Sequence, residues 1–361
     1  MEIRHFISPH TSSFTELNAL TDAPPPPEML PEVHASFSLV HELDRSIKAL
    51  TRSLENLIKC QLTAIKASPE NWGGGLAEQA MSEFMEQVHA KRIRHQMWVQ
   101  QVRVCAWSMA YCYNSLSPEQ HSERVAEQYR ILSELHDRSV PPEIADAYDA
   151  VLSAPNDFFE KLLELIALIK NGYLAGYEHI IAAYGDFFTD FTEQITAKLQ
   201  EWISGANDGK DVKLDAQKMR LALDSLLQKY SHPNPASVLF PKPGQGGASK
   251  EEAEKWQKAL GLPGSCLKRN ADGTWCVVMD IGPLQAMRAS IPQSGGVVTW
   301  DTAKYSAWRT GFDAQAEQMK NMLQSFTQKY SNANSYHDNF NKTLSSHLNQ
   351  FADMLKSMLN F

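Results

Sequence analysis

Two long stretches without proline constrain the fold of this chain most strongly. One runs from Asn156 to Ser231, and the other begins after Pro292 and reaches Phe361. A proline inside a helix removes a backbone hydrogen bond and clashes with the preceding turn. Each stretch is therefore free to form a long helix, provided that its apolar residues follow a helical spacing.

The first stretch has that spacing. From Phe159 to Trp202 the apolar residues recur at steps of three and four, which predicts one helix over 156–203. Such a helix has about 48 residues and is about 70 Å long at the standard rise. Consecutive four-residue steps at Tyr173 and Ile195 resemble stutters, which locally unwind a supercoil.

The second stretch carries a heptad pattern over 301–361. One line of residues, from Phe312 to Phe340, recurs every seven positions, and a second line runs from Ala316 to Leu344. This pattern is typical of a coiled coil. The simplest arrangement is an intramolecular antiparallel coiled coil between the two stretches. Its predicted seam includes Tyr177, Tyr184, Phe187, Phe191, Phe312, Met319, Leu323, Phe326, Tyr330, Phe340 and Leu344.

The N-terminal part is predicted to contain a disordered leader and a helical hairpin. Residues 1–35 include DAPPPPEMLPE, whose prolines favour an extended, mobile chain. Helical spacing then runs from Phe37 to Ile65 and from Met81 to Leu116, with NWGGG as a turn between them. Two such helices should pack antiparallel, in a domain over 36–153.

Residues 204–300, between the two long helices, change character. VKL, SVLF, WCVVMDI and GVVTW read as short strands, and helical patterns occupy 215–230 and 250–260. Asp-Gly pairs in GANDGKD and RNADGTW predict turns. We expect a small mixed α/β domain inserted at the tip of a long stalk, in a chain that is mainly α.

Composition argues against several classes of protein. The net charge of −8 argues against nucleic acid as a partner, and the one basic run, KRIRH at 91–95, is expected to be a solvated helix face. No apolar run is long enough for a signal peptide or a membrane span, which leaves export by another route open. Of five cysteines, only Cys266 and Cys276 leave a disulfide pairing open.

No constellation for chemistry is found in the sequence. GQGGASK lacks the spacing of a phosphate loop, and the twelve histidines show no metal-binding pattern. We therefore expect that the protein is not an enzyme and that it has no catalytic residues, no cofactor and no metal site. His337 falls on the predicted seam, where a core histidine is favoured over a pH switch.

The stretch QKYSNANSYHDNFNK at 328–342 keeps the seam spacing but is rich in Asn and Ser, which compete with a helical backbone for hydrogen bonds. A solvated coiled-coil face more often carries Lys, Glu and Gln. An amide-rich face instead suits docking against another protein, and a plain solvated face is the alternative. We call the predicted partner interface the docking face. It comprises Lys329, Ser331, Asn332, Asn334, Ser335, Asp338, Asn339 and Lys342.

The same region resembles a known family. The resemblance is carried by residues 301–348, which run from DTAKYSAWRTGF through KYSNANSYHDNF to LSSHL, and by the segments VKLD, SVLFP, LPGSCLK and WCVVMDIGPLQ. Through them the chain resembles type III secretion needle-tip proteins of the invasion type, the IpaD/SipD/BipD family. The resemblance in sequence spans residues 156–361. Over residues 1–155 it is mainly one of architecture, a disordered leader followed by a helical hairpin. A departure is Tyr336-His337, where family members usually carry an aliphatic residue followed by Tyr.

The resemblance implies a protein that is made in the bacterial cytoplasm, exported through the needle and held at its tip on the bacterial surface. Its implied partners are the needle subunit, a hydrophobic translocator and further copies of itself in a ring, often a pentamer. The hairpin would act as a self-chaperone that covers the coiled coil, and some members bind bile salts such as deoxycholate.

Two other classes rank lower. The C-terminal MLKSMLNF suggests a translocator or effector that acts directly on host membranes, but these helices keep polar faces. An enzyme could reside only in the α/β insertion, which lacks a set of acid, base and nucleophile.

Overall fold

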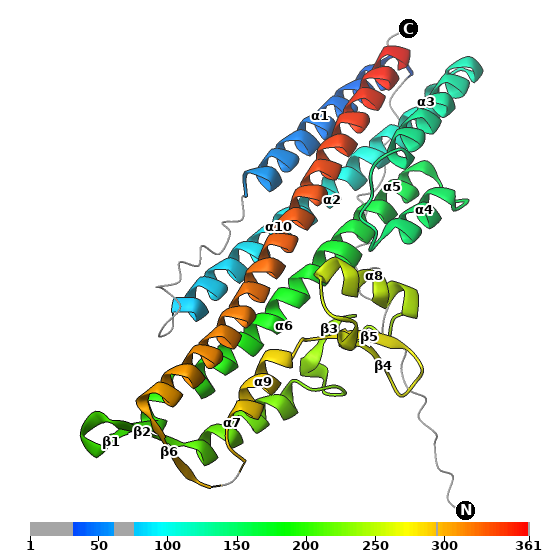
Figure 1. The fold of residues 1–361 in the computed structure, drawn as a ribbon. Coiled ribbons are helices and arrows are strands. Elements are labelled where there is room, and N and C mark those ends of the chain that lie inside the picture. Colours follow the sequence, from blue (N-terminus) through cyan, green and yellow to red (C-terminus); the bar gives the residue numbers. More distant parts are fainter. Residues whose placement is uncertain (1–31, 61–75, 294, 360–361) are drawn as a thin grey trace, which may run out of the picture.

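The computed structural model describes residues 32–60, 76–293 and 295–359. Its longest element is the 58-residue helix α10 (Thr302–Leu359), which lies against helical segments from the middle of the chain (Figure 1). Those segments are α5 (Phe158–Ala167), the π-helical segment Leu168–Leu174, α6 (Ala175–Phe191), the π-helical segment Thr192–Thr196 and the 3-10 turn Leu199–Trp202. The prediction of a mainly α fold is confirmed.

Aromatic contacts establish that the two long stretches are antiparallel. The ring of Phe191 lies 6.4 Å from that of Phe312, and the ring of Tyr184 lies 5.1 Å from that of Phe326. Residues late in the first stretch therefore contact residues early in α10. The rings of Tyr184 and Phe326 meet at 89°, an edge-to-face geometry that is favourable beyond the area it buries.

The expectation of one uniform α-helix over 156–203 is wrong in detail. The helix adopts π turns at Leu168–Leu174 and Thr192–Thr196, which contain the two stutter positions. A π turn accommodates one extra residue within a helix. It thereby returns the apolar side chains to the seam, since Tyr173 is 7% exposed and Ile195 is fully buried.

Helices α1 (Glu32–Lys59) and α2 (Leu76–Cys112) form a hairpin beside α10 (Figure 1). They are antiparallel, since the thiol of Cys105 lies 3.5 Å from the hydroxyl of Ser46 and Arg94 donates to the sulfur of Cys60 at 3.0 Å. Helix α1 includes residues 32–35, which the sequence pattern assigns to the leader. The rest of the leader and the NWGGG turn lie outside the described residues.

Helices α3 (Pro118–His136) and α4 (Ala145–Ser153) connect the hairpin to the coiled coil. Ser117 and Gln120 form a capping box that begins α3. The side chain of Gln120 also donates to the carbonyl of Met358 at 2.9 Å. Helix α3 is thereby held at the C-terminal end of α10.

The insertion forms two three-stranded antiparallel sheets. One has the order β1 (Ile203–Ala206), β2 (Asp211–Asp215) and β6 (Val297–Asp301), and the other has the order β3 (Val238–Phe240), β5 (Trp275–Val278) and β4 (Leu267–Arg269). The accompanying helices are α7 (Ala216–Lys229), α8 (Lys250–Leu260) and α9 (Gly282–Ser290). The sequence does not predict β1, β4 or α9, because ISGA and LKR hold few of the β-branched and aromatic residues that signal a strand, and α9 has only nine residues.

The expectation that the whole insertion sits at the tip of the stalk is wrong. The first sheet lies at the start of α10, but the second packs along α6 (Figure 1). There the Trp256 ring covers Gly176, where an added Cβ would lie 2.7 Å from the indole. The missing side chain at Gly176 therefore lets α8 approach the coiled coil.

All five cysteines are free. Cys266 and Cys276, the pair that the sequence leaves open, are both buried at 2% exposed. Burial raises the pKa of the Cys266 thiol to about 11. These side chains act as small core residues.

Candidate docking site

The predicted seam residues are all buried, although Tyr177 also packs on Trp256 of α8 and Tyr330 on Phe84 of α2. None of the eleven is more than 3% exposed. The hydroxyl of Tyr184 donates across the seam to the carbonyl of Met319 at 3.3 Å. The seam thus fixes which face of α10 points away from α6.

The docking face divides into an exposed part and a covered part. Four side chains at alternating steps of three and four form what we call the exposed stripe: Asn332, Ser335, Asn339 and Lys342. Lys329 and Ser331 lie beside it and are partly exposed. Ser335 donates to the carbonyl of Ser331 at 3.0 Å, and Gln328 donates to Asn332 Oδ1 at 3.0 Å, so two polar groups on the stripe are satisfied within the helix.

Asn334 and Asp338 do not face solvent, which corrects their expected exposure. Asn334 is 8% exposed, and the Asp338 side chain is 14% exposed. The heptad pattern indicates only which residues of α10 face its partner in the coiled coil. Helix α2 is a further neighbour of α10 and covers side chains that the pattern assigns to the solvent. Helix α2 runs parallel to α10, since Phe84 lies 5.6 Å from Tyr330 and Lys91 pairs with Asp338.

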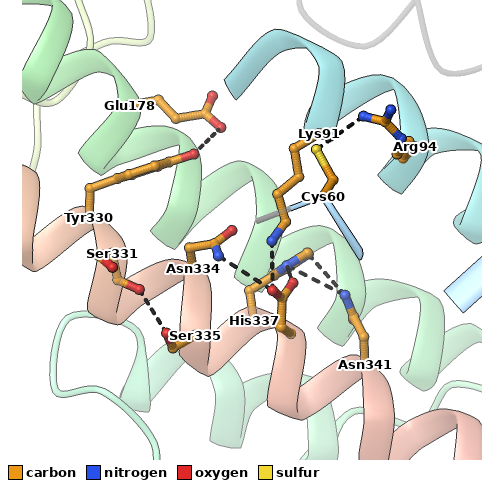
Figure 2. Close-up of polar contacts among 11 residues, drawn as sticks. Cys60, Lys91, Arg94, Glu178, Tyr330, Ser331, Asn334, Ser335, His337 and Asn341 are labelled. Atoms are coloured by element: carbon orange, nitrogen blue, oxygen red, sulfur yellow. Dashed lines mark hydrogen bonds and ion pairs between the residues drawn. The ribbon is translucent and has the colours of Figure 1, made fainter. Parts of the chain in front are cut away.

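The contact between α2 and α10 is polar where it covers the docking face (Figure 2). Lys91 Nζ lies 2.6 Å from Asp338 Oδ2, with the Lys91 side chain only 5% exposed. Asn334 donates to the same carboxylate at 3.4 Å, and His337 Nδ1 lies 3.3 Å from it. Burial alone would raise the pKa of Asp338, but His337 and Lys91 together hold it below its ordinary value.

The expectation that KRIRH is a solvated helix face is wrong for Lys91 and His95, whereas Arg92 and Ile93 are exposed. Lys91 and His95 are 4% and 2% exposed, and they face α10. Arg92 pairs with Glu178 of α6. Glu178 also accepts a hydrogen bond from Tyr330 at 3.5 Å (Figure 2). The composition of this run does not separate its buried cations from its exposed ones, but its helical spacing does. A plot of α2 as a helix would have placed Lys91 and His95 on the face of Val88 and Trp98.

A cavity of about 930 Å³ adjoins this cluster. It lies between α2, the π-helical segment with α6, and the β3–α8 region. Apolar side chains such as Val88, Phe240 and Trp256 line it together with the cations Arg92 and Lys242. Glu143, Glu178 and Glu252 also line it, so its wall combines apolar surface with side chains of both charges.

Among the described residues, no group of three or more His, Cys, Asp or Glu side chains could hold a metal ion. No helix in the described ranges has the length and apolarity that crossing a bilayer requires.

A family model for type III secretion systems tip complex components matches residues 77–359. Over 208 residues the chain is 40% identical to the cell invasion protein SipD of Salmonella typhi, covering 56% of this chain and 61% of that protein. Over 227 residues it is 37% identical to the invasin IpaD of Shigella flexneri, covering 62% of this chain and 65% of that protein. The matched part therefore spans less than two thirds of either relative.

A solved structure supports the same fold. The Pathogenicity island 1 effector protein from Chromobacterium violaceum is 25% identical and aligns with a TM-score of 0.59, covering 90% of this chain and all of that one. The similarity therefore extends through the N-terminal hairpin as well as the coiled coil.

Proposed function

This chain belongs to the family of type III secretion systems tip complex components, and from that premise we propose that it caps the needle of such a system. The observation that carries the proposal is the exposed stripe on α10, which no other element covers within the described residues. Its short amides and hydroxyls are donors and acceptors that lose little rotamer freedom on binding. We propose that the needle subunit docks there.

The hairpin of α1 and α2 would regulate that docking. Lys91 holds Asp338 beneath α2, beside the exposed stripe. A partner that needs the whole docking face must therefore displace α2 from α10. This arrangement supports a self-chaperone role, in which the hairpin covers the face until the needle subunit competes for it.

We further propose that several copies form a ring at the tip, restrain secretion and provide the platform for a hydrophobic translocator. A pentamer is the expected size from the family resemblance. The proposed location is the needle tip on the bacterial surface, after export through the needle from the cytoplasm.

Titrating this chain into isotopically labelled needle subunit from the same secretion system tests the proposal. Saturable line broadening or shift changes confined to one end of the subunit are expected. A subunit that is assembly-competent yet shows no change at high micromolar concentrations of this chain would contradict it.

The cavity between α2, α6 and α8 is the proposed site for bile salts such as deoxycholate. A rigid sterol skeleton would lie against Trp256 and Phe240, with its carboxylate near Lys242 or Arg92. Ligand binding to the folded state raises the midpoint of thermal unfolding. We expect deoxycholate below its micelle concentration to raise that midpoint, and Lys242→Gln to reduce the rise. An unchanged midpoint for the unaltered chain would refute the site.

A further inference from the structure

Two imidazoles meet at the contact between α2 and α10. The ring centres of His95 and His337 lie 4.5 Å apart, and the two side chains are 2% and 1% exposed. Within the described part of the chain, neither ring nitrogen of His95 has a hydrogen-bond partner. A buried polar group without a hydrogen-bond partner lowers the stability of the folded state. Such groups are rare in packed helix contacts, so the burial of His95 calls for an explanation.

Cations surround the pair. Lys91 of α2 and Lys170 of the π-helical segment both disfavour a charge on either ring, and Asp338 of α10 is the facing carboxylate. That carboxylate is already paired with Lys91 at 2.6 Å. Farther around the adjoining cavity lie Arg92, Glu143, Glu178, Lys242 and Glu252. A proton added to His95 would thus meet no acceptor and two like charges.

The adjoining cavity gives the pair access to water. His95 and His337 are both among its lining residues. A small separation of α2 from α10 would therefore hydrate both rings, and it would leave in place the seam contacts Tyr184–Phe326 and Phe191–Phe312, which do not involve α2.

We propose that the His95–His337 contact is an acid-sensitive latch, which keeps the α1–α2 hairpin on α10 at neutral pH and releases it in mild acid. The proposal concerns how the docking face is uncovered, and it holds whether or not the needle subunit is the partner.

The direction of the effect follows from the two protonation states. Burial and the neighbouring His337 lower the pKa of His95 to about 2, and burial lowers that of His337 below its ordinary value. Once exposed, each ring regains an ordinary pKa near 6.5 and takes up a proton below it. The closed contact is therefore fully stable above pH 6.5 and weakens as the pH falls.

The size of the effect can be stated for pH 5. Each ring that stays neutral in the closed form and titrates normally in the open form raises the opening constant about 30-fold. Two such rings give up to about 1,000-fold. Asp338 adds nothing in this range, because its pKa lies below its ordinary value of 3.8 and its contact is lost only in stronger acid.

Hydrogen exchange of the isolated chain between pH 7.5 and pH 5, corrected for the intrinsic rate, tests the latch. Protection of α2 around 84–98 is expected to fall by two to three powers of ten, while α7 keeps its protection. His95→Gln should make that fall about 30-fold smaller, and His95→Gln with His337→Gln should leave less than about tenfold. His89→Gln, an exposed histidine on the same helix, is the matched control and should behave like the unaltered chain.

Three results would overturn the proposal: unchanged protection of α2 in the unaltered chain, equal acid sensitivity in the double variant, or loss of protection in α7 to the same extent. If the double variant fails to fold, the NMR chemical shifts of the imidazole carbons in the unaltered chain test the latch instead. Both rings must remain neutral in the closed form at pH 5.5, and a ring that titrates near 6.5 while α2 stays protected would refute the latch.

Discussion

Replacing Phe326 with alanine is expected to destabilise the chain by about 3–5 kcal/mol, the typical cost of truncating a fully buried aromatic residue. Phe326 is completely buried in the seam, edge to face with Tyr184. Truncation removes that contact and leaves a cavity between α6 and α10. The free energy of unfolding from urea denaturation, followed by circular dichroism, measures the loss.

The control for this variant is Asn321→Ala. Asn321 lies on the same helix but is exposed, so its truncation should change stability by no more than about 0.5 kcal/mol. Equal effects for the two variants would mean that Phe326 is not in a packed seam.

Changing Asn332 and Asn339 together to leucine is expected to weaken binding of the needle subunit by about 10- to 100-fold. Both side chains belong to the exposed stripe and can donate and accept hydrogen bonds there. Leucine removes those hydrogen bonds and leaves polar groups of the partner unpaired, and a total cost of about 1.4–2.8 kcal/mol corresponds to that loss of affinity. Isothermal titration calorimetry or the titration described above measures the change.

Leucine favours helix more than asparagine does, so the variant should fold and any loss should lie in the interface. Asn321→Leu is the matched control: the same substitution on an exposed position of α10, about 16 Å along the helix from Asn332. Unchanged affinity in the double variant would remove the exposed stripe from the interface. An equal loss in the control would mean that the effect is not specific to the stripe.

The long helices could be predicted because their pattern repeats many times. Positions such as Phe312 and Phe326 belong to a heptad series that continues through α10, and helices of this length are held by a continuous seam. Even the irregularities at Tyr173 and Ile195 were visible as changes of step. Only their form, a π turn rather than an unwound supercoil, required the structure.

The polar contacts of α2 could not be predicted. Lys91 and His95 share a helical face with Val88 and Trp98, but nothing in the sequence shows which element contacts that face. Their burial depends on α10, more than 240 residues later in the chain. For the same reason Asp338 was assigned to a free surface, although a third helix covers it.

The location of the second sheet also depends on a distant contact. Gly176 gives no signal in an apolar helical pattern beyond a slightly weaker helix. Its role becomes clear only when Trp256 is seen against it.

The central claim is that the hairpin and the needle subunit compete for one face of α10. Hydrogen exchange of this chain at pH 7.5, with and without saturating needle subunit, tests it most directly. We expect α2 around Lys91 to lose protection in the complex while α6 keeps it. Bound needle subunit with the protection of α2 unchanged or increased would show that the two do not compete.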